Sequence, residues 1–130
     1  MPSRRTFLQI ALAGATLAPL AFRDALDRSA GASDHLHKAI FDRRFPAGIA
    51  FALDAERRGV PVHGIEGDVT ALWYHDLYFA WRNGPAPIAG VTTAASLFCL
   101  ETLARDAGLR VTERRSLDDN LVSWSIGPGA

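Results

Sequence analysis

Hydrophobic side chains recur at helical spacing in the stretch 90–111, which carries the strongest periodic signal in the chain. The repeat consists of Leu97, Leu100, Ala104 and Ala107, widened by Leu103 and Cys99. Thr92 or Thr93 is placed to cap the start of this helix, and Gly108 stands where a left-handed C-terminal residue is wanted. The pattern therefore predicts a loop, a helix and the beginning of a strand.

A similar strand–helix–strand pattern comes earlier in the chain. Ala39–Asp42 reads as a short strand, and Pro46 suits the first position of a helix because its missing N–H is not needed there. We expect this helix to run to about Arg58 and to end at Gly59. The next apolar run, Val60–Ile65, predicts a second strand.

The stretch 69–83 allows two interpretations. In one, a hairpin follows the second strand and Val69–Tyr74 is its return strand. In the other, which we prefer, Asp68 caps a helix over Val69–Asn83 that Gly84 closes. The apolar arc of that helix would be Val69, Leu72, Trp73, Leu77 and Ala80. The helix places Asp76 inside this arc, where a carboxylate needs a partner.

The rest of the chain predicts three more strands. Pro87–Val91 leads into the helix described first, and Leu109–Arg115 follows that helix. Leu121–Ile126 alternates with period two, as an antiparallel strand does. The fold class is therefore α/β: a small mixed sheet of three strand–helix units, followed by an antiparallel C-terminal strand pair, behind an N-terminal signal helix.

The N-terminus resembles a twin-arginine export signal. In Ser3–Leu8 the pair Arg4 and Arg5 is followed, one residue on, by Phe7 and Leu8. The resemblance implies export by the twin-arginine (Tat) machinery and a periplasmic location. That route carries folded proteins, often redox enzymes already loaded with cofactor, or small partners exported in complex with them.

An apolar run and a cleavage pattern fit the same interpretation. Phe7–Ala21 is short for a membrane span and suits the apolar region of a signal peptide. Ala30–Ala32 fits the small-x-small pattern, which divides the chain into a signal peptide, 1–32, and one domain, 33–130, with no membrane span of its own. Cleavage after Ala18, or retention of the segment as a membrane-anchoring helix, are the alternatives.

Composition excludes several classes of protein. The formal net charge of the chain is +0, and the part from Ser33 has ten basic and twelve acidic side chains, so no basic field is available for nucleic acid. The single cysteine, Cys99, cannot form an intramolecular disulfide or a cysteine-rich metal site, and we expect it to be a small buried side chain. No GxGxxG or Walker sequence occurs, so no cofactor is predicted.

Three loops are expected to converge at the carboxyl ends of the parallel strands, where ligands bind in such sheets. Their polar residues are Asp42, Arg43, Arg44, Glu66, Asp68, Thr92 and Thr93. An anion at the helix start near Thr92 and Thr93, with an arginine beside it, is one hypothesis. The other is that these threonines and Asp68 are helix caps and that the arginines pair with neighbouring acids.

The histidines do not predict a metal site. His63 and His75, with Glu66 and Asp68, are metal ligands by residue type, but their spacing is not diagnostic. His37 lies in a polar stretch near the expected cleavage site, so we expect it to be solvated.

Aromatic side chains are unusually dense in one short stretch. Trp73, Tyr74, Tyr78, Phe79 and Trp81 fall within nine residues, and Phe98 lies on the polar side of its helix. Either a second packed layer or the C-terminal hairpin covers them, or Trp73, Tyr74, Tyr78, Trp81 and Phe98 form a surface for a protein partner.

Two functions follow as hypotheses, and the sequence does not decide whether the protein is an enzyme. The first is a small exported accessory protein that binds a larger extracytoplasmic enzyme, with redox enzymes the favoured class. The second is a small periplasmic enzyme or ligand-binding domain that uses the three loops.

Overall fold

A five-stranded mixed sheet organises the fold in the computed structural model, which describes residues 36–118 and 120–129. The strands lie in the order β2-β1-β3-β5-β4. β1 is parallel to both β2 and β3, whereas β5 is antiparallel to β3 and to β4. The α/β class, the parallel strand–helix units and the antiparallel C-terminal pair are therefore confirmed. The export motif and the cleavage patterns lie outside the described residues.

The helices and strands follow one another along the chain in the predicted order. The strands are β1 (Lys38–Asp42), β2 (Val62–Ile65), β3 (Ile88–Thr93), β4 (Leu109–Ser116) and β5 (Leu121–Pro128). The helices are α3 (Pro46–Arg57), α4 (Thr70–Leu72), the π-helical turn η1 (Trp73–Leu77), α5 (Tyr78–Arg82) and α6 (Ala94–Asp106).

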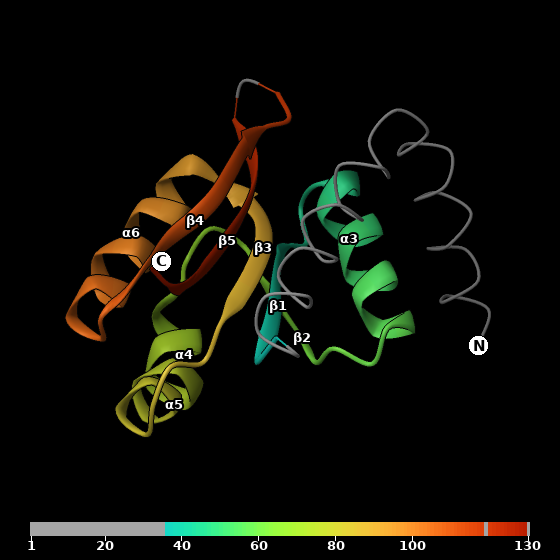
Figure 1. Ribbon diagram of the computed structural model, residues 1–130. Coiled ribbons are helices and arrows are strands. Elements are labelled where there is room, and N and C mark those ends of the chain that lie inside the picture. Colours follow the sequence, from blue (N-terminus) through green and yellow to red (C-terminus); the bar gives the residue numbers. More distant parts are fainter. Residues whose placement is uncertain (1–35, 119, 130) are drawn as a thin grey trace.

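Helices cover both faces of the sheet (Figure 1). α3 packs on one face, here called the α3 face, where the core contains Leu36, Ala39, Phe51, Ala55, Ala89, Val91 and Leu121. The opposite face, the α6 face, is covered by α6 and by the α4–η1–α5 segment. Its core includes Ile40, Ile65, Leu72, Leu77, Ile88, Leu97, Leu100, Trp124 and Ile126. The sheet is thus the middle of three layers, as right-handed crossovers between parallel strands require.

The central contact of the α6 face joins β3 to β5. Gly90 on β3 stands opposite Trp124 on β5, and a Cβ atom at Gly90 would lie 2.4 Å from Cζ2 of the indole. The missing side chain lets the ring lie against the strand. The indole Nε1 donates a hydrogen bond of 3.0 Å to Oγ1 of Thr92, so the one polar atom of this buried ring is paired.

The chain is helical from Thr70 to Arg82, so the helix of the preferred interpretation is confirmed and the hairpin alternative is wrong, but the N-cap is Val69 and not Asp68. The turn η1 inserts a wider i→i+5 loop, which places Leu72 and Leu77, five residues apart, on the same buried side. Trp81 follows four residues later and is only 6% exposed, with its Nε1 donating to the carbonyl of Ala86 at 2.9 Å. The structure therefore places Trp81 in the core, and not on the expected aromatic partner surface.

α6 follows the sequence pattern closely. Leu97, Leu100 and Ala104 are buried, and Thr93 caps the helix by accepting a hydrogen bond from the amide of Ser96. Cys99 is exposed, so its predicted burial is wrong. Its neighbour Leu100 takes the inward position at that turn of the helix.

β4 is an edge strand with a strongly polar outer half. Leu109 is buried, but exposed and partly exposed residues alternate after it and Arg114, Arg115 and Ser116 are all exposed. The pairing with β5 shifts between Val111 and Glu113, as at a β-bulge.

Across the described ranges, none of the helices has the length and the apolar character that a membrane crossing requires.

Gly90→Ala is expected to destabilise the protein by about 1–3 kcal/mol, because the new methyl would overlap the Trp124 ring and the backbone carbonyl of Ile40. Urea unfolding measures the effect. Gly127→Ala is the matched control, since its Cβ would meet only Pro87 Cβ at 3.7 Å. We expect the control to be neutral or to stabilise by up to about 1 kcal/mol. Equal midpoints for the two variants would contradict the close packing of Trp124 on β3.

Candidate functional site

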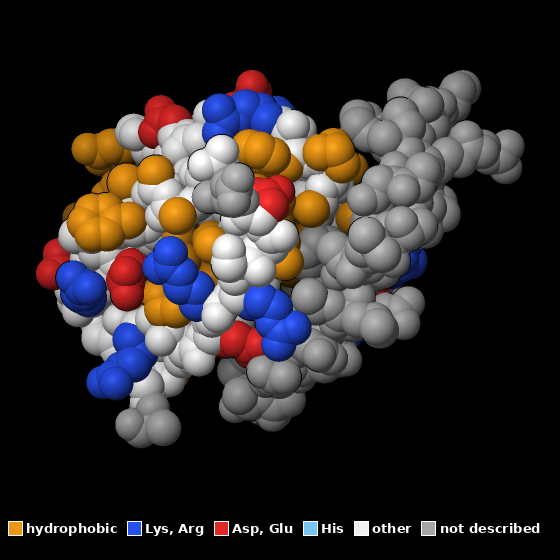
Figure 2. All heavy atoms as spheres, turned by 90° about the horizontal axis from the view of Figure 1, so that it is seen from above, with side chains coloured by type: hydrophobic (Ala, Val, Ile, Leu, Met, Phe, Trp, Pro, Cys, Tyr) orange, Lys and Arg blue, Asp and Glu red, His pale blue; other side chains and the backbone are white. Residues whose placement is uncertain are grey.

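The carboxyl ends of β1, β2 and β3 bring the predicted loops to one end of the sheet. Figure 2 looks onto this end from above and shows basic and acidic side chains interspersed on it. The carboxylate of Asp42 is fully buried here. It accepts hydrogen bonds from three groups of Arg44: the backbone N at 3.0 Å, Nε at 2.9 Å and Nη2 at 2.7 Å.

The charge of Asp42 is held by this arginine. Burial alone would raise the pKa of the carboxyl, but the hydrogen bonds and positive charge of Arg44, with the amide of Gly67, outweigh burial and lower the pKa below its ordinary value. The same pair raises the pKa of Arg44. Arg44, whose side chain is about half exposed, therefore forms an ion pair with Asp42 within the loop that follows β1.

The threonines and Asp68 are also engaged. The hydroxyl of Thr92 donates to the carbonyl of Thr93 at 3.0 Å and accepts from the Trp124 indole. The Thr93 cap contacts the hydroxyl of Ser96, which donates to the carbonyl of Gly67 at 2.8 Å. These bonds fasten the loop after β2 to the start of α6.

Asp68 and Glu66 complete the predicted set. Asp68 accepts from the amide and hydroxyl of Thr70, at 2.9 and 2.6 Å, and these bonds lower its pKa. Glu66 is exposed. Asp42, Arg44, Gly67, Thr93 and Ser96 thus meet at one end of the sheet. The anion site beside Thr92 and Thr93 stays a prediction. Thr92 and Arg44 already have hydrogen-bond or ion-pair partners within the protein, which does not favour such a site.

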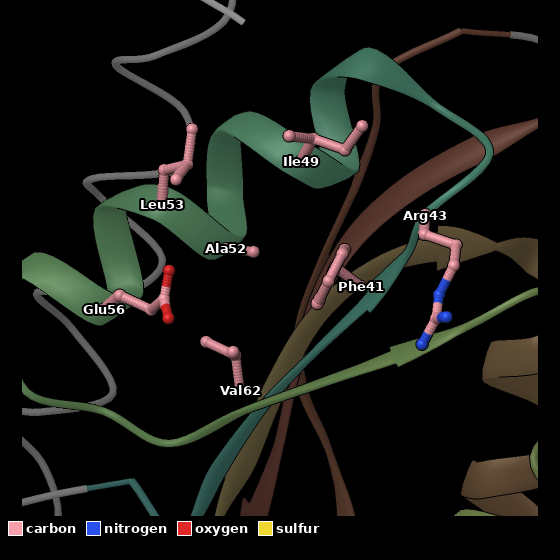
Figure 3. Close-up of a pocket in the computed structure, with 7 residues that line it drawn as sticks. All are labelled: Phe41, Arg43, Ile49, Ala52, Leu53, Glu56 and Val62. Carbon is pink, nitrogen blue, oxygen red and sulfur yellow. The ribbon is translucent and has the colours of Figure 1, made fainter. Parts of the chain in front are cut away.

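Arg43 turns away from the other loops, onto the α3 face. Its Nη2 donates to the carbonyl of Gly64 on β2 at 2.9 Å. There it borders a cavity of about 420 Å³ between α3 and the strands β1 and β2 (Figure 3). The cavity is lined by Phe41, Arg43, Ile49, Ala52, Leu53, Glu56 and Val62. A sizeable apolar cavity with a cation at its border is the geometry of a small-ligand site.

A second polar cluster lies where β1 begins, beside the turn η1. Asp76 accepts a hydrogen bond of 2.7 Å from Nε2 of His37, and Nζ of Lys38 approaches its other oxygen at 2.5 Å. The contact between Lys38 and Asp76 is an ion pair. The Asp76 carboxylate is only 16% exposed. It therefore has the partners that we expected a carboxylate inside the apolar arc of this helix to need.

His37 is consequently not the solvated side chain that the sequence suggested. Burial would raise the pKa of Asp76, but Lys38 and His37 lower it further than burial raises it. His63 lies nearby on β2, where burial and the charge of Lys38 lower its pKa. His75 is exposed. Within the described part of the chain, no three metal-ligating side chains come together.

Aromatic side chains are exposed on η1, α5 and α6. The exposed fractions are 64% for Tyr74, 38% for Tyr78, 58% for Phe79 and 64% for Phe98. Tyr78 contacts Trp73 and Phe79 edge to face, with ring centroids 5.6 and 5.2 Å apart, and the Arg82 guanidinium lies over its ring at 5.2 Å. Trp73 itself is partly buried against the core.

Sequence reasoning missed the cavity and the Asp76 cluster. The cavity left a signal: Ile49, Leu53 and Glu56 follow a helical stripe that faces away from the core residues Phe51 and Ala55. For the Asp76 cluster, the sequence indicated only that Asp76 needs a partner. The partner His37 is 39 residues away, and local spacing cannot identify a residue at that separation.

Comparison with protein-family models, with curated proteins and with solved structures found no match.

Asp76→Asn is expected to lower stability by about 1–3 kcal/mol near pH 7, because it removes the charge that His37 and Lys38 share. The lowered pKa means that the stabilisation is present above the unfolded pKa, near 3.8, and is lost as the pH falls through the folded value. The variant and the natural protein should therefore converge in acid.

Urea midpoints between pH 7 and pH 3 test this convergence. Asp106→Asn, an exposed change at the end of α6, is the control and should stay within about 0.5 kcal/mol of the natural protein. A deficit of Asp76→Asn that is the same at every pH would contradict an electrostatic role.

Proposed function

We propose that this protein is a small exported accessory protein that binds a larger extracytoplasmic enzyme, a redox enzyme being the favoured class. The aromatic surface formed by Tyr74, Tyr78 and Phe79 is the observation that carries the proposal, and Phe98 is a further exposed ring on α6. The resemblance of Arg4, Arg5, Phe7 and Leu8 to a twin-arginine motif supports export to the periplasm.

These rings are exposed although the segment that carries most of them also has a buried side. The neighbouring residues Leu72, Leu77 and Trp81 on the same segment are buried, so a core-facing side exists and is filled. Tyr74, Phe79 and Phe98 stand outside it, where water contacts most of each ring. Aromatic residues of this kind are enriched in protein–protein interfaces, where they supply large contact areas with few rotatable bonds.

The surface is also well ordered for binding. Tyr78 is held between Trp73, Phe79 and the Arg82 guanidinium. A ring fixed by such contacts loses little conformational freedom when a partner covers it. Arg82 adds a cation at the border of the surface, and Arg is likewise enriched in interfaces.

The double variant Tyr74→Ser, Phe79→Ser tests the surface. We expect at least a tenfold loss of affinity for the partner, because both rings would be central contacts, with a stability change below about 1 kcal/mol because both are exposed. Native mass spectrometry of gently isolated protein identifies the partner chain, and titration with that chain measures the affinity.

Arg114→Ser is the control, since this exposed side chain lies on β4, outside the aromatic surface. It should leave the complex intact. Undiminished binding by the double variant, or isolation of the natural protein without any second chain, would contradict the proposal.

Replacement of Arg4 and Arg5 by lysine tests the export step separately. We expect the protein to remain in the cytoplasm, because a twin-arginine signal depends on the guanidinium pair and lysine keeps only its charge. Cell fractionation measures the distribution. The same replacement at Arg114 and Arg115 is the control. Periplasmic recovery of the Arg4 and Arg5 variant would show that export follows another route.

A further inference from the structure

The cavity on the α3 face combines an apolar lining with a cation, Arg43, that pairs with no acidic side chain among the described residues. Every other lining residue except Glu56 is apolar: Phe41, Ile49, Ala52, Leu53 and Val62. None of the ion pairs within the described residues includes Arg43, whereas Arg44, Arg57 and Arg58 each pair with an aspartate. The single bond of Arg43 to the Gly64 carbonyl leaves most of its five N–H donors available.

We propose that this cavity binds a small monocarboxylate with an apolar body, its carboxylate resting on Arg43. A guanidinium binds a carboxylate through two parallel hydrogen bonds, which are stronger than neutral ones. The apolar body would lie between α3 and the strands, against Phe41, Ala52 and Val62 (Figure 3). The volume of the cavity, about 420 Å³, lies toward the lower end of the range for small-molecule sites, which limits the ligand to a small one.

The stripe on α3 sets the length of the body. Ile49 and Glu56 both border the cavity and are seven residues apart, which is about 10.5 Å along a helix. Figure 3 shows Arg43 beside β2 and Glu56 at the other end of the labelled group. A second acidic group on the ligand would have to lie among apolar side chains such as Ile49, Leu53 and Val62, with no second cation in the described lining, and burying that charge costs free energy. The site therefore selects a monoacid over a diacid of the same length.

Gly64 keeps the guanidinium in place. A Cβ atom at this position would lie 2.7 Å from Nη2 of Arg43 and 2.9 Å from Cζ of Phe41. Only a residue without a side chain leaves room for the arginine to lie across β2 and reach the cavity. Gly64→Ala is therefore expected to displace the cation without changing any charge.

The inference is independent of the proposed partner surface. Arg43 and the cavity lie on the α3 face, whereas Tyr74, Phe79 and Phe98 belong to elements that cover the α6 face. Failure of one proposal leaves the other standing, because the variants and the measured ligands differ.

Calorimetry and NMR titration of the full chain with octanoate test the site. We expect saturable binding of one octanoate, with the largest shifts at Ile49, Leu53 and Val62. Octan-1-ol, which lacks the charge, and octanedioate, which adds a second one, should each bind at least tenfold more weakly. Arg43→Ala should weaken octanoate binding at least tenfold, Gly64→Ala should weaken it severalfold, and both should retain the fold by circular dichroism.

Arg114→Ala is the matched control: it removes the same charge from the far edge strand and should change octanoate affinity less than twofold. Absence of saturable binding overturns the proposal. So does equal affinity for octan-1-ol, which would show an apolar cavity without charge recognition. Equal weakening by Arg43→Ala and Arg114→Ala would also overturn it, since the effect would then be one of net charge.

Discussion

The contact between Trp124 and Gly90 is the constraint on which the rest of the structure depends. It fixes β5 against β3, and so places the antiparallel pair beside the parallel strands. The indole of Trp124, the largest buried side chain, also donates a hydrogen bond to Thr92. Thr92 directly precedes Thr93, the cap of α6, so this bond ties β5 to the start of that helix. The position of α6 and of the loop that Ser96 fastens follows from this one packing arrangement.

Two faces of one sheet serve different purposes in this fold. The α6 face uses its inner side chains for the core and turns Tyr74, Phe79 and Phe98 outward. The α3 face is covered by a helix rich in small residues, and beside it a cavity remains open along β1 and β2. At the carboxyl ends, the buried Asp42 and its arginine close the loop between them and leave the neighbouring Arg43 to face that cavity.

Local sequence patterns predicted the helices and strands. The positions of the candidate site residues depend instead on contacts between residues far apart in the sequence. The stripe of α6 and the cap at Thr93 follow from residues a few positions apart, which is why they could be predicted. The buried state of Trp81 depends on the π-helical turn, which helical periodicity does not include. The direction of Arg43 depends on a carbonyl 21 residues away, and the partners of Asp76 lie in a stretch that looked like a solvated lead-in.

Both edges of the sheet carry features that discourage strand addition by another copy. β2 has only four residues and follows Pro61, and β4 ends in a run of exposed charged and polar residues beyond its bulge. Short edges, proline, charge and bulges are the means by which natural sheets avoid edge-to-edge polymerisation. A domain that exposes aromatic rings while blocking its own sheet edges resists fibrous self-assembly, so that its apolar surface stays available for a different molecule.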